Sequence, residues 1–171
     1  MTLAREMALE SEYVMGTFAR KPVEFVEGHG MTLIDDAGNE YLDFLSGIGV
    51  CSLGHCHPSI VQAVSDQAAK LIHVSNYYYI EHRGEVAQLL SNMLNAYVDE
   101  PSPETWKTFF ANSGAEANEC AIKLARLYAR RRTEAAGKDA ELAPRLIVTL
   151  AKSFHGRTLA TLAATAQPAK Q

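Results

Sequence analysis

Residues 105–152 restrict the possible folds of this chain more than any other part of it. Thr105–Ala111 is rich in residues that favour β-strands, and Arg145–Lys152 contains the near-continuous apolar run Leu146-Ile147-Val148, typical of a buried parallel strand. Between them, Ala115 to about Ala136 has helical spacing of apolar residues, and Gly137 is a plausible C-cap residue. The pattern therefore predicts a βαβ unit with parallel strands, and hence an α/β fold.

The first part of the chain predicts helices and an antiparallel hairpin. The turn is Asp36-Ala37-Gly38-Asn39, in which Gly38 can adopt a positive φ. The expected elements, in chain order, are a helix over residues 3–17, strands at Val23–Glu27, Met31–Asp35 and Glu40–Phe44, and helices from Pro58 and from about Glu81 to Leu94.

Composition excludes several classes of protein. A net charge of -4 argues against nucleic-acid binding, no apolar run reaches the roughly 18 residues of a membrane helix, and charged residues near the N-terminus argue against a signal peptide. The odd number of cysteines, 3, without a Cys-x-x-Cys pair indicates reduced thiols and a cytoplasmic location. His55 and His57 have no further acidic ligands nearby in the sequence, so we expect no metal site.

Two loops should meet at one edge of the predicted sheet. Asn112–Glu116 follows the first strand and Ser153–Arg157 follows the second, and ligands of open α/β sheets bind outside the carboxyl ends of strands. Ser113-Gly114-Ala115 opens the helix, where free N–H groups can bind an anion, although Ser113 could be only an N-cap. Phe154 could stack on a planar ring and Arg157 could clamp a carboxylate, or the ring could pack into the core and the arginine face solvent.

Four segments carry a family resemblance. They are Asp36–Phe44, Leu53–Pro58, Phe109–Glu119 and Ser153–Thr158. In this order they resemble the corresponding segments of the class III pyridoxal-phosphate-dependent aminotransferases. Phe109–Glu119 resembles the phosphate loop of that family. The similarity is greatest to the acetylornithine aminotransferase branch, because of Phe154, Ser75-Asn76-Tyr77 and Ala117–Ala129.

The resemblance implies a fold type I transferase. Residues 1–75 would form a small N-terminal α+β segment with a hairpin and a helix, and residues 76–171 the first βαβ unit of the large, mainly parallel-sheet domain. The implied protein is a homodimer with pyridoxal 5'-phosphate as cofactor. It would transfer an amino group between N-acetylornithine and 2-oxoglutarate in arginine biosynthesis, without nucleic-acid or membrane partners.

The resemblance also assigns roles to individual residues. Ser113, Gly114 and Ala115 would hold the cofactor phosphate, mainly through backbone N–H groups. Phe154 would stack on the pyridine ring, and Arg157 would bind the α-carboxylate of the substrate. Ser46–Val50 and Tyr77 would line the substrate entrance.

One departure from the family pattern concerns catalysis. The family's Schiff-base lysine and the aspartate that pairs with the pyridinium nitrogen lie further along, and none of the lysines of this sequence stands in that motif. We therefore expect the N-terminal part of an aminotransferase, without a catalytic residue of its own and inactive alone. The alternatives are a class III enzyme for ornithine, succinylornithine, 4-aminobutyrate or a diaminopimelate-pathway substrate, and a non-catalytic phosphate-binding or dimerising fragment. An unrelated nucleotide binder is disfavoured, because no P-loop or Gly-x-Gly-x-x-Gly motif follows a strand.

Overall fold

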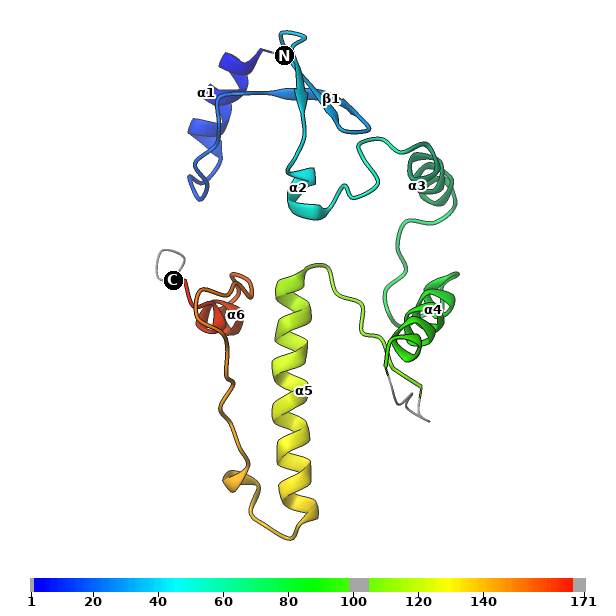
Figure 1. Cartoon of the computed structure of the whole chain (residues 1–171), viewed down its shortest axis with the longest axis vertical. Helices are drawn as coiled ribbons and strands as arrows, with labels where there is room; N and C mark the ends of the chain where they lie inside the picture. The colour runs from blue at the N-terminus through cyan, green and yellow to red at the C-terminus, as the bar shows by residue number, and fades with distance from the viewer. Residues whose placement is uncertain (1, 99–104, 168–171) are drawn as a thin grey trace. The chain divides into compact units, whose positions relative to one another are not determined.

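A computed structural model describes residues 2–98 and 105–167 and divides the chain into two compact units, Met1–Tyr79 and Ile80–Gln171 (Figure 1). The first unit contains α1 (Leu3–Tyr13), β1 (Phe25–His29), β2 (Thr32–Asp35), β3 (Glu40–Leu42), α2 (Ser46–Gly49) and α3 (Pro58–Lys70). The second unit contains α4 (Arg83–Ala96), α5 (Gly114–Ala135), the 3₁₀ helix η1 (Ala140–Leu142) and α6 (Leu159–Ala164). The helices predicted from the sequence are confirmed, with ends that differ by a few residues. The division of the chain into domains of residues 1–75 and 76–171 stays a prediction.

The first unit is organised by its β-hairpin. β1, β2 and β3 form an antiparallel sheet in that order, and Gly38 in the turn has a φ of 82°, as the sequence predicts. Asp35, only 6% exposed, closes the turn: its carboxylate accepts hydrogen bonds from the N–H groups of Ala37 (3.0 Å) and Asn39 (2.8 Å) and from the Tyr41 hydroxyl (2.9 Å). The side-chain hydrogen bond from Asn39 is the main reason why the pKa of Asp35 lies below its ordinary value.

The strands predicted at Thr105–Ala111 and Arg145–Lys152 are not strands in the described part of the chain. A strand needs a neighbouring strand for its N–H and C=O groups. Instead, the N–H of Trp106 donates to the Ser91 hydroxyl of α4 (3.2 Å), and the second segment runs back along α5 (Figure 1). Leu146 and Val148, expected to be buried, are 93% and 92% exposed. The predicted parallel pairing is therefore wrong for the residues described, which form a mixed α/β structure with a small antiparallel sheet.

Helix α5 has well-defined ends. At its start, the Ser113 hydroxyl accepts a hydrogen bond from the N–H of Glu116 (3.2 Å). At its end, Gly137 takes a φ of 70° and donates to the Glu134 carbonyl (2.9 Å), while the Lys138 N–H donates to the Thr133 carbonyl (3.1 Å). These two bonds form a Schellman motif, so the C-cap glycine that the sequence predicts is confirmed.

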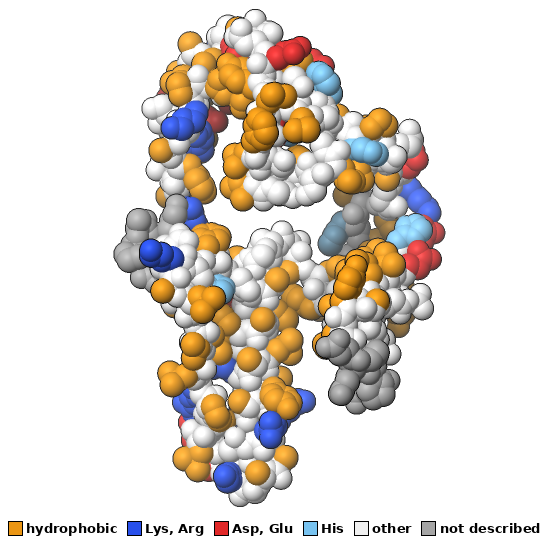
Figure 2. All heavy atoms as spheres, in the orientation of Figure 1, with side chains coloured by type: hydrophobic (Ala, Val, Ile, Leu, Met, Phe, Trp, Pro, Cys, Tyr) orange, Lys and Arg blue, Asp and Glu red, His pale blue; other side chains and the backbone are white. Residues whose placement is uncertain are grey.

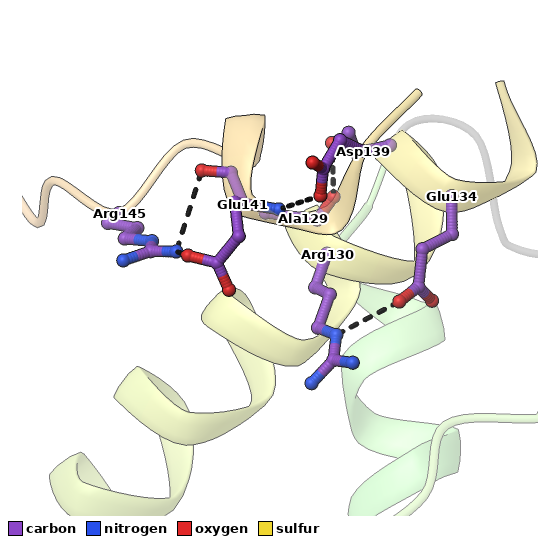
Figure 3. A network of polar contacts seen from close by, with 7 residues as sticks. Ala129, Arg130, Glu134, Asp139, Glu141 and Arg145 are labelled. Carbon is purple, nitrogen blue, oxygen red and sulfur yellow. Dashed lines mark hydrogen bonds and ion pairs between the residues drawn. The ribbon is translucent and has the colours of Figure 1, made fainter. Parts of the chain in front are cut away.

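Polar contacts fix the chain where it turns back after α5 (Figure 3). Arg130 pairs with Glu134 within the helix (3.0 Å), and Arg145 pairs with Glu141. Asp139 caps η1 by accepting from the Glu141 N–H (2.9 Å). The Arg145–Glu141 pair and the Asp139 cap hold the segment after α5 locally, and exposed ion pairs such as these contribute little to stability individually.

Apolar side chains are spread over the surfaces of both units (Figure 2). Among the described residues, Ala143 is the one buried hydrophobic side chain, while large side chains such as Ile72, Tyr79 and Leu159 are 86–101% exposed. Apolar surface of this extent is typical of faces that pack against further protein. Among the described helices, none combines the length and the apolar composition needed to cross a membrane.

The turn at Asp35 leads to a pH prediction. Because the pKa of Asp35 is lower in the folded hairpin than its ordinary value of 3.8, its carboxylate stabilises the turn above that pH and loses this effect as the pH falls through the folded pKa. We expect the hydrogen-exchange protection factors of the Ala37 and Asn39 amides to fall over this acidic range. Asp35→Asn should lower them about tenfold near neutral pH, since charge-assisted bonds are lost.

The matched control is Asp36→Asn, because the Asp36 carboxylate accepts from the Leu3 N–H, outside the turn. Protection factors that depend neither on pH nor on Asp35 would contradict this account of the hairpin.

Candidate functional site

The start of α5 offers two unused hydrogen-bond donors. Within the described part of the chain, the N–H groups of Gly114 and Ala115 have no acceptor, since the first turn of a helix has none of its own. A Cβ atom added to Gly114 would meet no atom within 4 Å, so the space beside this residue is open. Two N–H groups at the positive end of a helix of 22 residues can bind an anion such as a phosphate.

The neighbouring polar groups limit this anion site. The carboxylate of Glu116 accepts from the N–H (2.8 Å) and the side-chain amide (3.1 Å) of Asn112. Asn112 therefore has its backbone donor occupied, and the Ser113 hydroxyl already caps the helix. Within α5 itself, Gly114 and Ala115 are left as the backbone donors available to a phosphate, and the N–H of Ser113, just before the helix, has no acceptor among the described residues either.

The 153–158 loop lies against this part of α5. The side-chain amide of Asn118 donates to the His155 carbonyl (2.8 Å). Gly156 is buried so closely that a Cβ atom added to it would lie 2.7 Å from the Cβ of Ala115. The convergence of Asn112–Glu116 and Ser153–Arg157 predicted from the sequence is therefore confirmed, although side chains rather than paired strands bring the two segments together.

Two threonines of the α6 region bind the backbone of this loop. Thr161 and Thr165 of the α6 region are 0% exposed. The Thr165 hydroxyl accepts from the N–H of His155 (3.0 Å), and the Thr161 hydroxyl accepts from the N–H of Thr158 (3.0 Å). The loop is thus held at its backbone on both sides of Arg157.

Phe154 and Arg157 are the two exposed side chains of interest in this loop. Phe154 is 55% exposed and makes no ring contact among the residues described, and Arg157 is exposed. Arg157 lies between Gly156, which packs on Ala115, and Thr158, which is hydrogen-bonded to Glu119 (2.5 Å). The structure thus brings the loop and the start of α5 together, while the roles of Ser113, Gly114, Ala115, Phe154 and Arg157 as cofactor- and substrate-binding residues stay predictions.

Glu119 is a residue of this junction that the sequence does not single out. Its position four residues before Lys123 indicates an exposed helix pair, yet its carboxylate turns to the loop and accepts from the Thr158 hydroxyl and from the N–H of Ala160 (3.2 Å). The hydrogen bond from Thr158 is the main cause that keeps the pKa of Glu119 below its ordinary value, and the charge of Lys123 contributes least. The spacing of Thr158, Thr161 and Thr165, three hydroxyls on one helical face, is the signal that could have indicated a polar junction here.

The remaining candidates lie in the first unit. Residues 46–50 include α2, where Gly47 and Ile48 have φ values of 61° and 64°, and Tyr77 is 94% exposed. Their role at a substrate entrance stays a prediction. His55 contacts Asp43 (2.7 Å) instead of standing free as a ligand, and no group of three potential metal ligands occurs among the residues that the structure describes.

Comparisons with known proteins agree on one family. The sequence pattern described as "Aminotransferase class-III" matches residues 17–171. The acetylornithine aminotransferase of Nitrosomonas europaea is 49% identical over 153 residues, which are 90% of this chain and 35% of that protein. The acetylornithine aminotransferase of Synechocystis sp. is 48% identical over 159 residues, 93% of this chain and 34% of that protein.

A solved structure agrees with these relatives. The ornithine aminotransferase of Toxoplasma gondii, in a crystal structure with partial occupancy of PLP at its active site, matches with a TM-score of 0.78 and 28% identity. The match covers 97% of this chain and 36% of that one. The chain thus resembles fold type I aminotransferases and spans about a third of the length of the relatives it matches.

The two glycines of the site should respond differently to the same substitution. An added methyl at Gly156 would meet the Thr161 hydroxyl at 2.6 Å and Ala115 at 2.7 Å, at a φ of 133°. We expect Gly156→Ala to lower the free energy of unfolding of the second unit by about 1–3 kcal/mol.

Gly114→Ala is the matched control, because it adds the same methyl to open space in a helix and should change that free energy by no more than about 1 kcal/mol. Urea unfolding followed by circular dichroism measures both. Equal effects of the two substitutions would mean that the loop does not pack on α5.

Proposed function

The chain belongs to the class III aminotransferases, and we propose that its residues 112–116 and 153–158 form the phosphate- and carboxylate-binding part of an acetylornithine aminotransferase active site. The observation that carries the proposal is the junction of the two loops, with Gly156 packed on Ala115 and two unused N–H donors beside it. A phosphate binds well where such donors meet the positive end of a helix.

The residues at the junction fit pyridoxal 5'-phosphate. The open side of Gly114 leaves room for its phosphate, and the half-exposed ring of Phe154 offers an apolar face for its pyridine ring. The guanidinium of Arg157 can bind the α-carboxylate of an amino acid with two parallel hydrogen bonds. When bound, the cofactor supplies an electron sink for chemistry at the amino-acid α-carbon. The residues of this chain hold the phosphate and orient the substrate.

The amino donor that we propose is N-acetylornithine, with 2-oxoglutarate as acceptor, in arginine biosynthesis. The support is the identity of 48–49% with two acetylornithine aminotransferases. We also propose that the enzyme is a homodimer, for which the uncovered apolar faces of both units provide surface. The free thiols of Cys51, Cys56 and Cys120 support a cytoplasmic location.

A chimera tests this function directly. Residues 17–171 replace the matching segment of the Nitrosomonas europaea enzyme, which supplies the rest of the family's length. We expect the chimera to transfer the amino group of N-acetylornithine to 2-oxoglutarate with a kcat/KM within about tenfold of the parent enzyme. A well-folded chimera that binds no pyridoxal phosphate would contradict the assignment of the phosphate site. A shift of preference toward ornithine, relative to the parent, would contradict the proposed donor.

Gly114→Val in this chimera tests the phosphate site. The branched side chain fills the open space beside this residue and obstructs the approach of a phosphate to the N–H groups of Gly114 and Ala115. Because a hydrogen bond to a charged group contributes about 1.5–3 kcal/mol, we expect the loss of one of these two bonds to raise the Kd of pyridoxal phosphate roughly 10- to 100-fold. Titration of the apo form measures this Kd.

Gly84→Val is the matched control, because Gly84 also lies in the first turn of a helix with no atom within 4 Å of an added Cβ. If Gly114→Val affects the cofactor no more than Gly84→Val does, the start of α5 is not the phosphate site.

Phe154→Ala and Arg157→Lys separate the cofactor from the substrate. Loss of a stacked ring costs about 0.5–1.5 kcal/mol beyond buried area, so Phe154→Ala should raise the Kd of pyridoxal phosphate about tenfold at most. Arg157→Lys keeps the charge but loses the planar fork, and should raise the KM for the amino acid much more than it changes the cofactor Kd. Steady-state kinetics and cofactor titration of the chimera distinguish the two effects. Equal changes in both constants would remove Arg157 from the carboxylate site.

A further inference from the structure

We propose that Glu119 is a positioning residue whose carboxylate fixes the 153–158 loop and thereby holds Arg157 in place for the substrate carboxylate, an inference that rests on the function proposed above. Glu119 lies in the second turn of α5, on the helix that also presents the anion site. In the described part of the chain, Glu119 forms no hydrogen bond with Phe154 or Gly114, the residues predicted to contact the cofactor.

The geometry of the carboxylate is specific. One oxygen, Oε1, accepts from the Thr158 hydroxyl at 2.5 Å and from the backbone N–H of Ala160 at 3.2 Å. Thr158 is the residue after Arg157 and also the N-cap of α6. Glu119 therefore binds both the loop end and the first turn of the helix that follows it, which determines where the backbone after Arg157 runs.

An ionised Glu119 also orders the hydroxyls around it. A carboxylate only accepts, so the single hydroxyl proton of Thr158 points to Glu119. The 2.7 Å contact between the two hydroxyls then needs Thr161 as the donor, and the one hydroxyl proton of Thr161 is also within reach of the Thr158 carbonyl (3.2 Å). Thr161 in turn accepts from the N–H of Thr158 (3.0 Å), which closes the capping box. The charge on Glu119 thus sets the direction of the Thr158 hydroxyl in this group of hydrogen bonds.

Arg157 lies between two anchored positions. Before it, Gly156 packs on Ala115 with no room for a side chain, and the N–H of His155 donates to the Thr165 hydroxyl at 3.0 Å. After it, Thr158 is held by Glu119. A long side chain loses conformational freedom when it binds a ligand, and anchoring its backbone on both sides lowers that cost. Loss of the Glu119 anchor would leave Arg157 charged and exposed but less well placed.

Limited proteolysis of the 171-residue chain tests the anchor without any ligand. Trypsin cleaves after Arg157 when the loop opens, and after Arg145 in the exposed segment that leads to Leu146, which serves as the internal reference. We expect Glu119→Ala to accelerate cleavage after Arg157 about tenfold relative to cleavage after Arg145, since two hydrogen bonds are lost and proteolysis follows the open population.

Glu119→Gln keeps an oxygen at this position and should restore the ratio to within about threefold of the unmodified chain. Glu134→Ala is the matched control on the same helix, because its carboxylate pairs with Arg130 and not with the loop. An unchanged ratio in Glu119→Ala, or equal acceleration at both sites, overturns the proposal, since the latter means a general loss of stability.

Kinetics of the chimera test the consequence for the substrate. Glu119→Ala should raise the KM for N-acetylornithine about tenfold, change the Kd of pyridoxal phosphate less than threefold, and be rescued by Glu119→Gln. A parallel loss of cofactor and substrate affinity overturns a role through Arg157. If the unmodified chimera is inactive, the proposed function fails, and the proteolysis result still decides whether Glu119 anchors the loop.

Discussion

The contact between the first turns of α5 and the 153–158 loop is the constraint on which the second unit depends. Neither segment that flanks this junction is paired in a sheet within the described residues, so backbone ladders do not hold them together. Asn118, Glu119 and the tight packing of Gly156 on Ala115 perform that task. Because these interactions are short and directional, they fix the loop within a narrow range of positions, which an apolar contact alone would not do.

This junction explains how the side chains of a site can be exposed to solvent while the backbone that carries them is fixed. The buried threonines take up the polar backbone groups of the loop, and the helix start keeps two N–H groups without a partner among the described residues. Phe154 and Arg157 remain on the outside. In the proposed aminotransferase, this arrangement separates the groups that hold the loop, such as Glu119, from those that bind cofactor and substrate, so that binding does not require the loop to be rebuilt.

Local patterns in the sequence were reliable where local physics decides the structure. Gly38 in the turn, Pro58 at the start of α3 and Gly137 at the end of α5 each satisfy a backbone requirement that few residues meet, and all three predictions are confirmed. The prediction of paired strands at Thr105–Ala111 and Arg145–Lys152 was wrong for the described residues, since a strand is stabilised by a neighbour that composition cannot supply.

The sequence by itself determined which segments are helices and turns, and the family resemblance, because caps, turns and the order of motifs are read within short stretches of chain. It also predicted the convergence of two distant loops, but through a strand pairing that the described residues do not form. Only the tertiary structure decided that Glu119 faces Thr158 instead of Lys123. It also decided that Gly156 touches Ala115 while Gly114 faces open space. Those contacts join residues about 40 positions apart in the sequence. Which of two possible partners a side chain faces depends on where those partners lie in space, and a local sequence pattern does not predict that.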